Sequence, residues 1–436
     1  MGRQSYSDRN GNHFTSGRNG DSPSVNTVQR IFPELSPEAL CGPIGEIVQV
    51  IEPHTEAHPA AVLIQLLAGF GSLIGSSPYA MGDAEHPAVI FATIVGQSSK
   101  SRKGTSWQPA KAVLKEIDPA WFENRVVSGL ASGEGIIHAV RDPVYGFCPK
   151  EKKEVMKDPG VDDKRLFVHE SEFAQGLAAM GRKDSILSPV IRSAWDDGKL
   201  SSLTKLNPSK ATHAHVSIVT HITQEELQRQ LHTCEFFNGF ANRFLWLITK
   251  RMRILPFGGK FTAALVANQI EALKKAVLAA RQGGEVTRSQ EARSEWAKGY
   301  EHLSRARSGR AGVVCDRAEA QVLRLSLIYA LSEGSFIIEL SHHEAAMAVW
   351  QYCEESAKYI FGDEPANPHA SKIIDALREA APEGITRTEI SETIFRRNLT
   401  ATQLSDALTT LHDAKLATRK IEHGAGRPIE RWYSTN

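Results

Sequence analysis

Cysteine, net charge and long apolar runs are all scarce in this sequence. The 436 residues include 5 cysteines, and no two of them have the CxxC spacing of a zinc or redox site. A disulfide framework is therefore not expected, and we expect a cytoplasmic protein in a reducing environment. The first residues lack an apolar segment, so no secretory signal is expected.

Charge of one sign is also lacking, because 51 basic and 50 acidic residues leave a formal net charge of +1. Bulk charge thus does not indicate a nucleic-acid partner, and any basic surface has to be local. The apolar run Ala60–Gly75 contains Gln65 and is shorter than the ~20 residues that a membrane-spanning helix needs. We expect a buried core helix there and no membrane partner.

The chain is long enough for two or three domains. Residues 1–26 are rich in Ser, Gly, Asn and Arg and have few aliphatic side chains, which predicts a disordered tail. Residues 27–362 are expected to form one domain with helical N- and C-terminal parts. A linker near Glu364–Pro368 then precedes a small module over residues 369–436.

Strand-like and helix-like stretches alternate within the larger domain. Residues Ala88–Val95 are continuously apolar, which is typical of a strand covered on both faces. The alternation predicts an α/β fold with a parallel sheet and helical flanks. Further strands are expected over Arg125–Ser128, Arg165–Val168, Val216–Thr220 and Phe244–Thr249, with helices over Gly133–Val140 and Gln224–Leu231.

A loop with glycines and lysines follows the first apolar strand and leads into a predicted helix over Trp107–Ile117. This order is that of a P-loop, in which backbone N–H groups and a lysine hold phosphates and a hydroxyl holds Mg²⁺. The spacing departs from GxxxxGK[ST], because Lys103 precedes Gly104. We expect ATP and Mg²⁺ as cofactors; the alternative is a basic loop without a ligand. The predicted nucleotide-binding residues are Gly96, Lys100, Arg102, Lys103, Gly104, Thr105 and Ser106, with Thr105 also a magnesium ligand.

Two acidic residues follow other predicted strands. Glu170 stands where a nucleotide hydrolase holds magnesium and polarises the attacking water, but His169 occupies the preceding place, where Asp is usual. Glu134 lies just past the Arg125–Ser128 strand and is a candidate general base. Each has a structural alternative: Glu170 as a solvated acid at a strand end, and Glu134 as an acid in the first turn of a helix.

Arg243 directly precedes the strand Phe244–Thr249. In ring ATPases an arginine from the neighbouring subunit stabilises the charge of the transition state, and we predict this role for Arg243. An ion pair within its own chain is the alternative. His221 is open between a phosphate sensor and a structural histidine, and Thr223 is expected to start a capping box with Glu226.

Taken in order, these motifs resemble a RecA-like P-loop ATPase family linked to plasmid and phage primase–helicase genes. The resemblance runs from about Phe32 to the end of the chain and implies ATP binding by a homo-oligomer, for which a hexameric ring is one arrangement. It further implies a motor of helicase or replication-initiator type acting on DNA. The alternative is a DNA-binding regulatory or scaffold protein with a degenerate nucleotide site. The shared segments are Pro53–Glu56, Gly96 with Arg102–Ser106, Ser132–Gly135, His169–Phe173, Ala194–Asp196, His221–Thr223, Asn238–Phe244 and Leu255–Gly259.

The pattern of residues 369–436 predicts a winged helix. An amphipathic helix over His369–Ala381 precedes two capping boxes, which start at Thr386 and Thr400, and strand-like runs cover Ala417–Glu422 and Ile429–Tyr433. We expect this module to bind DNA mainly through its wing, and a protein-binding role is the alternative. The predicted nucleic-acid contacts are Arg396, Arg397, Arg419, Lys420, Arg427 and Arg431.

Overall fold

The computed structural model describes residues 31–150, 152–203, 209–305, 307, 309–362, 367–413, 416–422 and 428–435. The predicted tail, residues 1–26, and Arg427 lie outside this part of the chain. Two separate hydrophobic cores are present, one drawing its residues from Ala39–Phe361 and the other from Ala370–Trp432.

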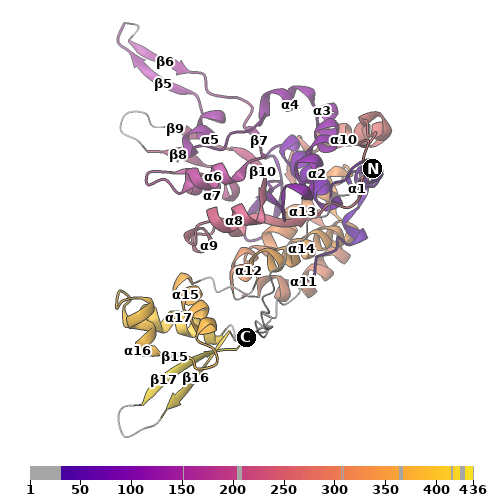
Figure 1. Ribbon diagram of the computed structural model, residues 1–436. Helices are drawn as coiled ribbons and strands as arrows, with labels where there is room; N and C mark the ends of the chain where they lie inside the picture. Colours follow the sequence, from indigo (N-terminus) through magenta and orange to yellow (C-terminus); the bar gives the residue numbers. More distant parts are fainter. Residues whose placement is uncertain are drawn as a thin grey trace, which may run out of the picture. The chain divides into compact units, whose positions relative to one another are not determined.

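A five-stranded sheet lies within the larger core, and all of its strands are parallel (Figure 1). The α/β prediction with a parallel sheet is therefore confirmed. Across the sheet, the order is β11-β3-β10-β7-β4. The strands are β3 (Phe91–Gly96), β4 (Val126–Val127), β7 (Arg165–Glu170), β10 (His215–Thr223) and β11 (Phe244–Thr249).

The two strands with the most continuous apolar sequence are buried along their whole length. Every residue of β3 and of β11 is buried, which explains why neither shows the alternation of a half-exposed strand. Numbered by their order in the chain, the strands run 5-1-4-3-2 across the sheet. The first strand, β3, therefore lies between the last two.

Helix α2 (Pro59–Ile74) packs against the sheet and contacts β3, β7, β10 and β11. All of its residues except Pro59 are buried, so the expectation of a core helix is confirmed. Gly71 allows the close approach, because a Cβ there would lie 2.4 Å from the carbonyl oxygen of Ala88. In the described part of the chain, no helix is long and apolar enough to cross a membrane.

The other helices of the larger core flank the sheet or extend the core (Figure 1). They are α1 (Gly42–Ile51), α3 (Trp107–Ile117), α4 (Pro119–Arg125), α5 (Gly133–Ala139), α6 (Phe173–Met180), α7 (Leu187–Asp196), α8 (Gln224–Gln230), α9 (Cys234–Phe237), α10 (Ala267–Ala280), α11 (Gln290–Ser304), α12 (Gly309–Val314), α13 (Ala318–Ser332) and α14 (Leu340–Phe361).

Short strands outside the main sheet form small sheets of two or three strands. Two of these are antiparallel hairpins that the sequence does not predict, because neither shows an alternating apolar pattern. One is β5 (Val144–Cys148) with β6 (Lys153–Asp158), and the other is β8 (Leu200–Ser202) with β9 (Ser209–Ala211). The rest are β1 (Pro78–Met81), β2 (Glu85–Pro87), β12 (Gly284–Glu285), β13 (Thr287–Arg288) and β14 (Ile337–Ile338).

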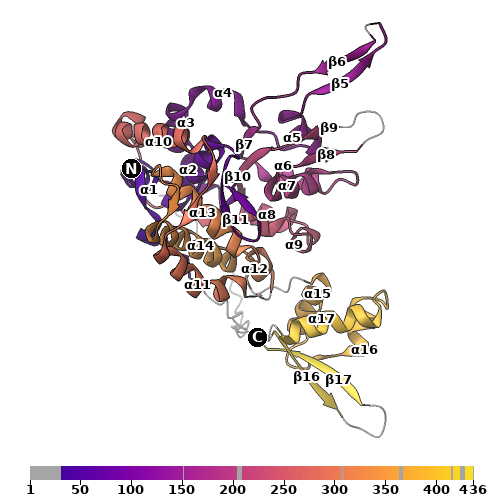
Figure 2. The same cartoon turned by 180° about the vertical axis from the view of Figure 1, so that it is seen from behind.

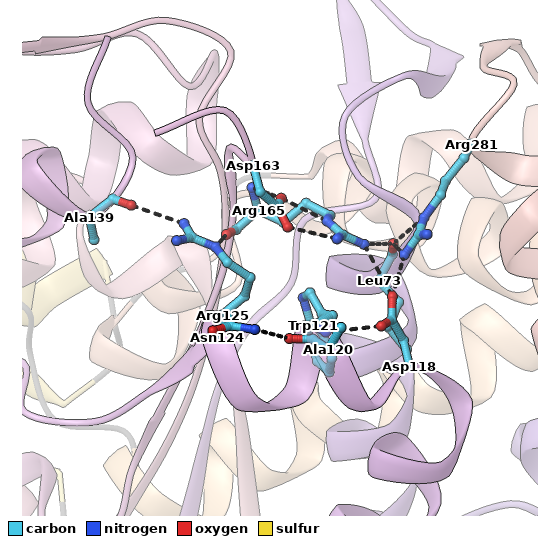
Figure 3. Close-up of polar contacts among 10 residues, drawn as sticks. All are labelled: Leu73, Asp118, Ala120, Trp121, Asn124, Arg125, Ala139, Asp163, Arg165 and Arg281. Atoms are coloured by element: carbon cyan, nitrogen blue, oxygen red, sulfur yellow. Dashed lines mark hydrogen bonds and ion pairs between the residues drawn. The ribbon is translucent and has the colours of Figure 1, made fainter. Parts of the chain in front are cut away.

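A polar network fixes the amino end of β7 to neighbouring helices (Figure 3). Arg165 pairs with Asp163 through both Nε and Nη2, at 2.8 and 2.7 Å, and its Nη1 donates to the carbonyl of Leu73 at 2.8 Å. Arg281 donates to the same carbonyl and to Asp118. The carbonyl of Leu73 lies in the last turn of α2, where carbonyl groups have no hydrogen-bond donor within the helix. The two arginines supply the missing donors to this carbonyl.

The smaller core belongs to residues 367–435. Its helices are α15 (Pro368–Glu379), α16 (Arg387–Glu389), a π-helical turn over Ile390–Ile394 and α17 (Ala401–Asp413). The strands β15 (Ile385–Thr386), β17 (Ile429–Ser434) and β16 (Ala417–Glu422) form an antiparallel sheet in that order. Both predicted capping boxes are present, because Thr386 pairs with Glu389 and Thr400 with Gln403.

Candidate nucleotide site

The loop after β3 lies at the carboxyl end of the sheet, between the ends of two other strands. Gly96 is in register with Thr223 of β10 on one side and Thr249 of β11 on the other. The chain folds back over Gly96, where a Cβ would lie only 2.0 Å from Oγ of Ser101. Glycine is therefore required at the position where the strand turns into the loop.

The loop passes directly into a helix. Arg102 has a left-handed backbone with φ of 62°, and a 3₁₀ turn over Gly104–Ser106 continues into α3. Within the described part of the chain, the N–H groups of Lys103 and Gly104 donate no hydrogen bond, and a Cβ on Gly104 would meet nothing within 4 Å. Free N–H groups beside open space at a helix start suit an anion.

The Lys103 side chain lies near the end of β10. Burial lowers the pKa of His221 well below its usual value, and positive charge on Lys103, or on His169 once it is protonated, lowers it further. Thr223 lowers the pKa of Glu226 by hydrogen bonding in the predicted capping box, and Lys103 adds to this effect. Lys103 is thus the half-buried cation of the loop, whereas Lys100 and Arg102 are exposed.

The two hydroxyl residues of the loop have different surroundings. Thr105 is exposed, as a ligand-binding hydroxyl has to be. Ser106 is fully buried, and its Oγ accepts a hydrogen bond from Nε2 of Gln65 at 2.9 Å. Oε1 of Gln65 in turn lies 3.3 Å from Nε2 of His221. Gln65 therefore joins the loop to β10 from inside α2, a role that its place in an apolar run did not reveal.

An aromatic stack lies beside this polar connection. The ring of Trp107, at the start of α3, stacks on His169 with centroids 4.1 Å apart, and His169 meets His221 edge-on at 4.9 Å. Burial lowers the pKa of His169 to about 4, so its imidazole is neutral at pH 7. A neutral imidazole does not supply the negative charge that an aspartate would bring to this position.

Glu170 ends β7 and is engaged by backbone groups. Its Oε2 accepts hydrogen bonds from the N–H groups of Gly129 and Leu130, at 2.9 and 3.0 Å, and its Oε1 accepts one from Glu172 at 3.1 Å. The carboxylate is buried and connects the end of β7 to the segment after β4. A carboxylate has about four acceptor positions, so one is left for a further ligand.

Glu134 lies on the segment that Glu170 helps to hold. It is exposed in the first turn of α5, whose N-cap Ser132 accepts a hydrogen bond from Gly135 at 3.0 Å. An acid in a first helical turn is stabilised by the helix dipole, which is the structural alternative for this residue. Its exposure also leaves it accessible to a bound ligand.

Arg243 lies at the other end of the sheet from the loop. It immediately precedes β11, whose first residue is in register with the first residue of β3. Arg243 is 5% exposed, and its guanidinium donates to both carboxylate oxygens of Asp196, at 2.6 to 3.1 Å, and to the carbonyl of Gly239. Its placement supports the alternative of an ion pair within its own chain over a contact with a neighbouring subunit.

A carboxylate from the N-terminal segment holds the loop from the outside. Glu56 is buried, and its Oε2 lies 2.6 Å from Nε of Arg102. Its Oε1 accepts from Arg251 and from the N–H of Leu255, the latter at 2.7 Å. The hydrogen bond from Leu255 lowers the pKa of Glu56, and burial opposes this effect, which the two arginines reinforce. In the sequence, Glu56 is notable only as the end of the segment Pro53–Glu56.

The predicted nucleic-acid contacts of the smaller core differ in their surroundings. Arg397 pairs with Glu392, and Nε of Arg431 lies 2.9 Å from Oε1 of Glu422. Arg396 is exposed, as are Arg419 and Lys420 of β16. Exposed cations without such pairing are the better placed for phosphate contact.

Comparison of the chain with known proteins supplies no family to set beside this geometry. No family model matches it, and no curated protein is found to be similar to it.

Proposed function

We propose that this chain is an ATP-binding and ATP-hydrolysing protein of the RecA-like P-loop class, acting on DNA as a homo-oligomer. The observation that carries the proposal is the loop Gly96–Ser106. It leaves the carboxyl end of a buried parallel strand and enters a helix, and it presents Lys103 together with N–H groups that donate no hydrogen bond within the described residues. Phosphate-binding loops of nucleotide hydrolases have this arrangement.

The strand order supports the same assignment. In RecA-like domains, the strand that precedes the phosphate loop lies between the last two strands of the chain. One strand separates it from the strand that ends in the acid. Here β3 lies between β10 and β11, and β10 separates it from β7, which ends in Glu170. The proposal also takes up the resemblance of the sequence motifs to the RecA-like family linked to primase–helicase genes.

The residues present fit a magnesium nucleotide in part. Lys103 and the N–H groups of the loop would hold phosphate oxygens, and Thr105 would bind Mg²⁺. When bound, the nucleotide would supply the phosphoryl group to be cleaved, and Mg²⁺ would offset the charge of its phosphate oxygens. Glu170 and Glu134 are the proposed acids; Glu170 has one acceptor position left after its three backbone hydrogen bonds.

DNA is proposed as the partner of the C-terminal residues. Three helical segments followed by an antiparallel hairpin, as in residues 367–435, support a winged helix. Its exposed cations Arg396, Arg419 and Lys420 would contact phosphates.

A DNA-binding regulatory or scaffold protein without ATP turnover is the second candidate. Two observations favour it: the carboxylate of Glu170 is largely occupied by backbone N–H groups, and His169 is neutral where a nucleotide hydrolase has an aspartate. Under this candidate the loop binds nucleotide weakly or not at all, and the C-terminal module carries the function.

An ATPase assay with and without DNA separates the two candidates. We expect turnover by the wild-type protein that DNA stimulates and that Lys103→Ala abolishes. Lys115→Ala is the matched control, because Lys115 is exposed on α3 outside the loop Gly96–Ser106, and it should retain most of the activity. Absence of turnover by the wild type, with or without DNA, would exclude the motor, and an active Lys103→Ala would exclude the assigned loop.

A further inference from the structure

The β5–β6 hairpin exposes apolar side chains that the core of this chain does not use. None of the residues in β5 is buried, and the same holds for β6. Figures 1 and 2 show both strands extending beyond the helices around the sheet. An isolated two-stranded hairpin is at best marginally stable in water. The exposed apolar groups therefore call for an explanation outside the core.

The aromatic residues of the hairpin share one face with a methionine. Tyr145 is in register with Met156, and Phe147 with Glu154. Because side chains alternate along a strand, both rings lie on the same face, about 7 Å apart along β5. Their exposures are 56% for Tyr145 and 61% for Phe147, and that of Met156 is 54%.

Four lysines lie on the same hairpin, two of them at its turn and two, Lys153 and Lys157, on the face opposite the rings, whereas Glu154 shares the face of the rings. Lys150, Lys152, Lys153 and Lys157 are all exposed on the hairpin. The acids of the same stretch are Glu151, Glu154 and Asp158, and Asp158 is engaged by Arg141 at the base. The outer part of the hairpin is therefore basic and aromatic, although the chain as a whole is nearly neutral.

The base of the hairpin is firmly held. Asp158 accepts from Nε and Nη2 of Arg141, at 2.7 and 3.0 Å, and from the N–H of Gly160 at 2.9 Å. These bonds, with that of Arg141 the largest cause, lower the pKa of Asp158 to about 2. Lys164 donates to the carbonyls of Val140 and Arg141 next to this pair. The exposed rings are thus presented by a preorganised arm.

We infer that the β5–β6 hairpin binds single-stranded nucleic acid, with bases stacked on Tyr145 and Phe147 and phosphates held by Lys150 and Lys152 at its turn. Aromatic rings interleaved with cations are the chemistry that binds unpaired strands without sequence preference. The cores of protein–protein interfaces are instead depleted of lysine. The inference rests on the proposed function in taking DNA as the partner, and it adds the element that holds the strand.

Fluorescence anisotropy of a labelled thymidine oligonucleotide tests this on the full chain without ATP. Phe147→Leu keeps the apolar bulk but removes the ring, and we expect it to weaken binding by about 5-fold or more, with a larger loss in Tyr145→Leu/Phe147→Leu. Changing Lys150 and Lys152 to Gln should reduce the slope of log affinity against log salt by about 1.4. Tyr300→Leu is the matched control, since Tyr300 is 43% exposed elsewhere on the chain, and it should bind as the wild type does.

Three results would overturn the inference. They are a wild type that does not bind the oligonucleotide, leucine variants that bind it with unchanged affinity, and leucine variants that change only the oligomeric state, which would indicate a protein contact. Circular dichroism melting checks that the variants fold, as expected for exposed positions. Because no ATP is present in the binding assay, its outcome is independent of the ATPase assay. A protein that does not turn over ATP and a hairpin that does not bind the oligonucleotide are therefore distinguishable results.

Discussion

Glu56 and Arg102 form an ion pair at 2.6 Å that connects the N-terminal segment to the loop after β3. The same carboxylate accepts from Arg251 and from the N–H of Leu255, which follow β11. One buried acid thus holds the loop in its position relative to the end of the neighbouring strand. The arrangement of the proposed phosphate site therefore depends on a residue that would not itself contact phosphate.

Removing this carboxylate should impair the site without removing any proposed ligand. In Glu56→Gln the pairings with Arg102 and Arg251 lose their charge, and we expect the loop to shift. Small displacements of a positioned group lower catalytic rates by up to about 100-fold, and we expect kcat to fall more than the affinity for ATP. Steady-state ATPase kinetics measure the change.

Glu52→Gln is the control for Glu56→Gln, because Glu52 pairs with Arg253, which lies outside the loop Gly96–Ser106. It should leave kcat near the wild-type value. Equal effects of the two substitutions would show that general loosening of the N-terminal segment, and not the pairing with Arg102, is responsible.

Arg243 should contribute to stability rather than to catalysis between subunits. Arg243→Ala leaves Asp196 without its buried partner, and because the Asp196 side chain is 42% exposed we expect a loss of about 1–3 kcal/mol in the free energy of unfolding. Asp196→Ala should cause a similar loss, and the double variant little more than either alone. Urea unfolding of the three variants measures this coupling.

An arginine acting on a neighbouring subunit would give a different pattern for Arg243. Asp196→Ala would then retain ATPase activity while Arg243→Ala lost it, with both proteins as stable as the wild type. Such a result would contradict the pairing within one chain as the reason for the arginine.

Buried neutral histidines should make the protein less stable in mild acid. Burial lowers the pKa of His58, His169 and His215 to about 4 from the usual 6.5. The unfolded chain therefore binds more protons than the folded chain below pH 6.5, so the free energy of unfolding falls as the pH is lowered from about 6.5 to about 4. Urea midpoints at pH 7.5, 6 and 5 measure this decline.

His169→Phe should reduce that pH dependence, because phenylalanine keeps the stack on Trp107 and does not protonate. The variant should lose less stability than the wild type between pH 7.5 and pH 5. An unchanged slope would mean that the pKa of His169 is the same in the folded chain as in the unfolded chain.

The C-terminal cations should differ in their effect on duplex DNA. Changing Arg419 and Lys420 to Gln removes two exposed charges and should lower the slope of log affinity against log salt by about 2. Arg397→Gln should have a smaller effect, since Arg397 already pairs with Glu392. A contact through β16 would be contradicted if the substitutions at Arg419, Lys420 and Arg397 all weakened duplex binding equally. It would also be contradicted if none of them changed the affinity for duplex DNA.

The strands and helices of the core were predictable because burial leaves a pattern in the sequence. The continuous apolar run before Gly96 became β3, and Phe244–Thr249 is a strand with the predicted bounds. Capping boxes located helix starts for a similar reason, since Thr223 and Glu226 satisfy each other's backbone N–H groups within one turn.

Contacts between distant segments were not predictable from local pattern. Gln65 looks like a polar interruption of an apolar helix, and its hydrogen bonds to Ser106 and His221 arise only when α2 packs across the sheet. Likewise, the partner of Arg243 is 47 residues away at Asp196. The β5–β6 hairpin was missed because exposure on both faces removes the alternation that marks a half-buried strand.

Equilibrium binding of ATP with Mg²⁺, measured by isothermal titration calorimetry on the wild type and on Lys103→Ala, tests the central claim most directly. If the loop Gly96–Ser106 holds the phosphates, the wild type binds ATP, and the loss of the Lys103 charge weakens binding by about tenfold or more, equivalent to about 1.4 kcal/mol. A wild type that binds no ATP, or a Lys103→Ala variant that binds it equally well, would contradict the account.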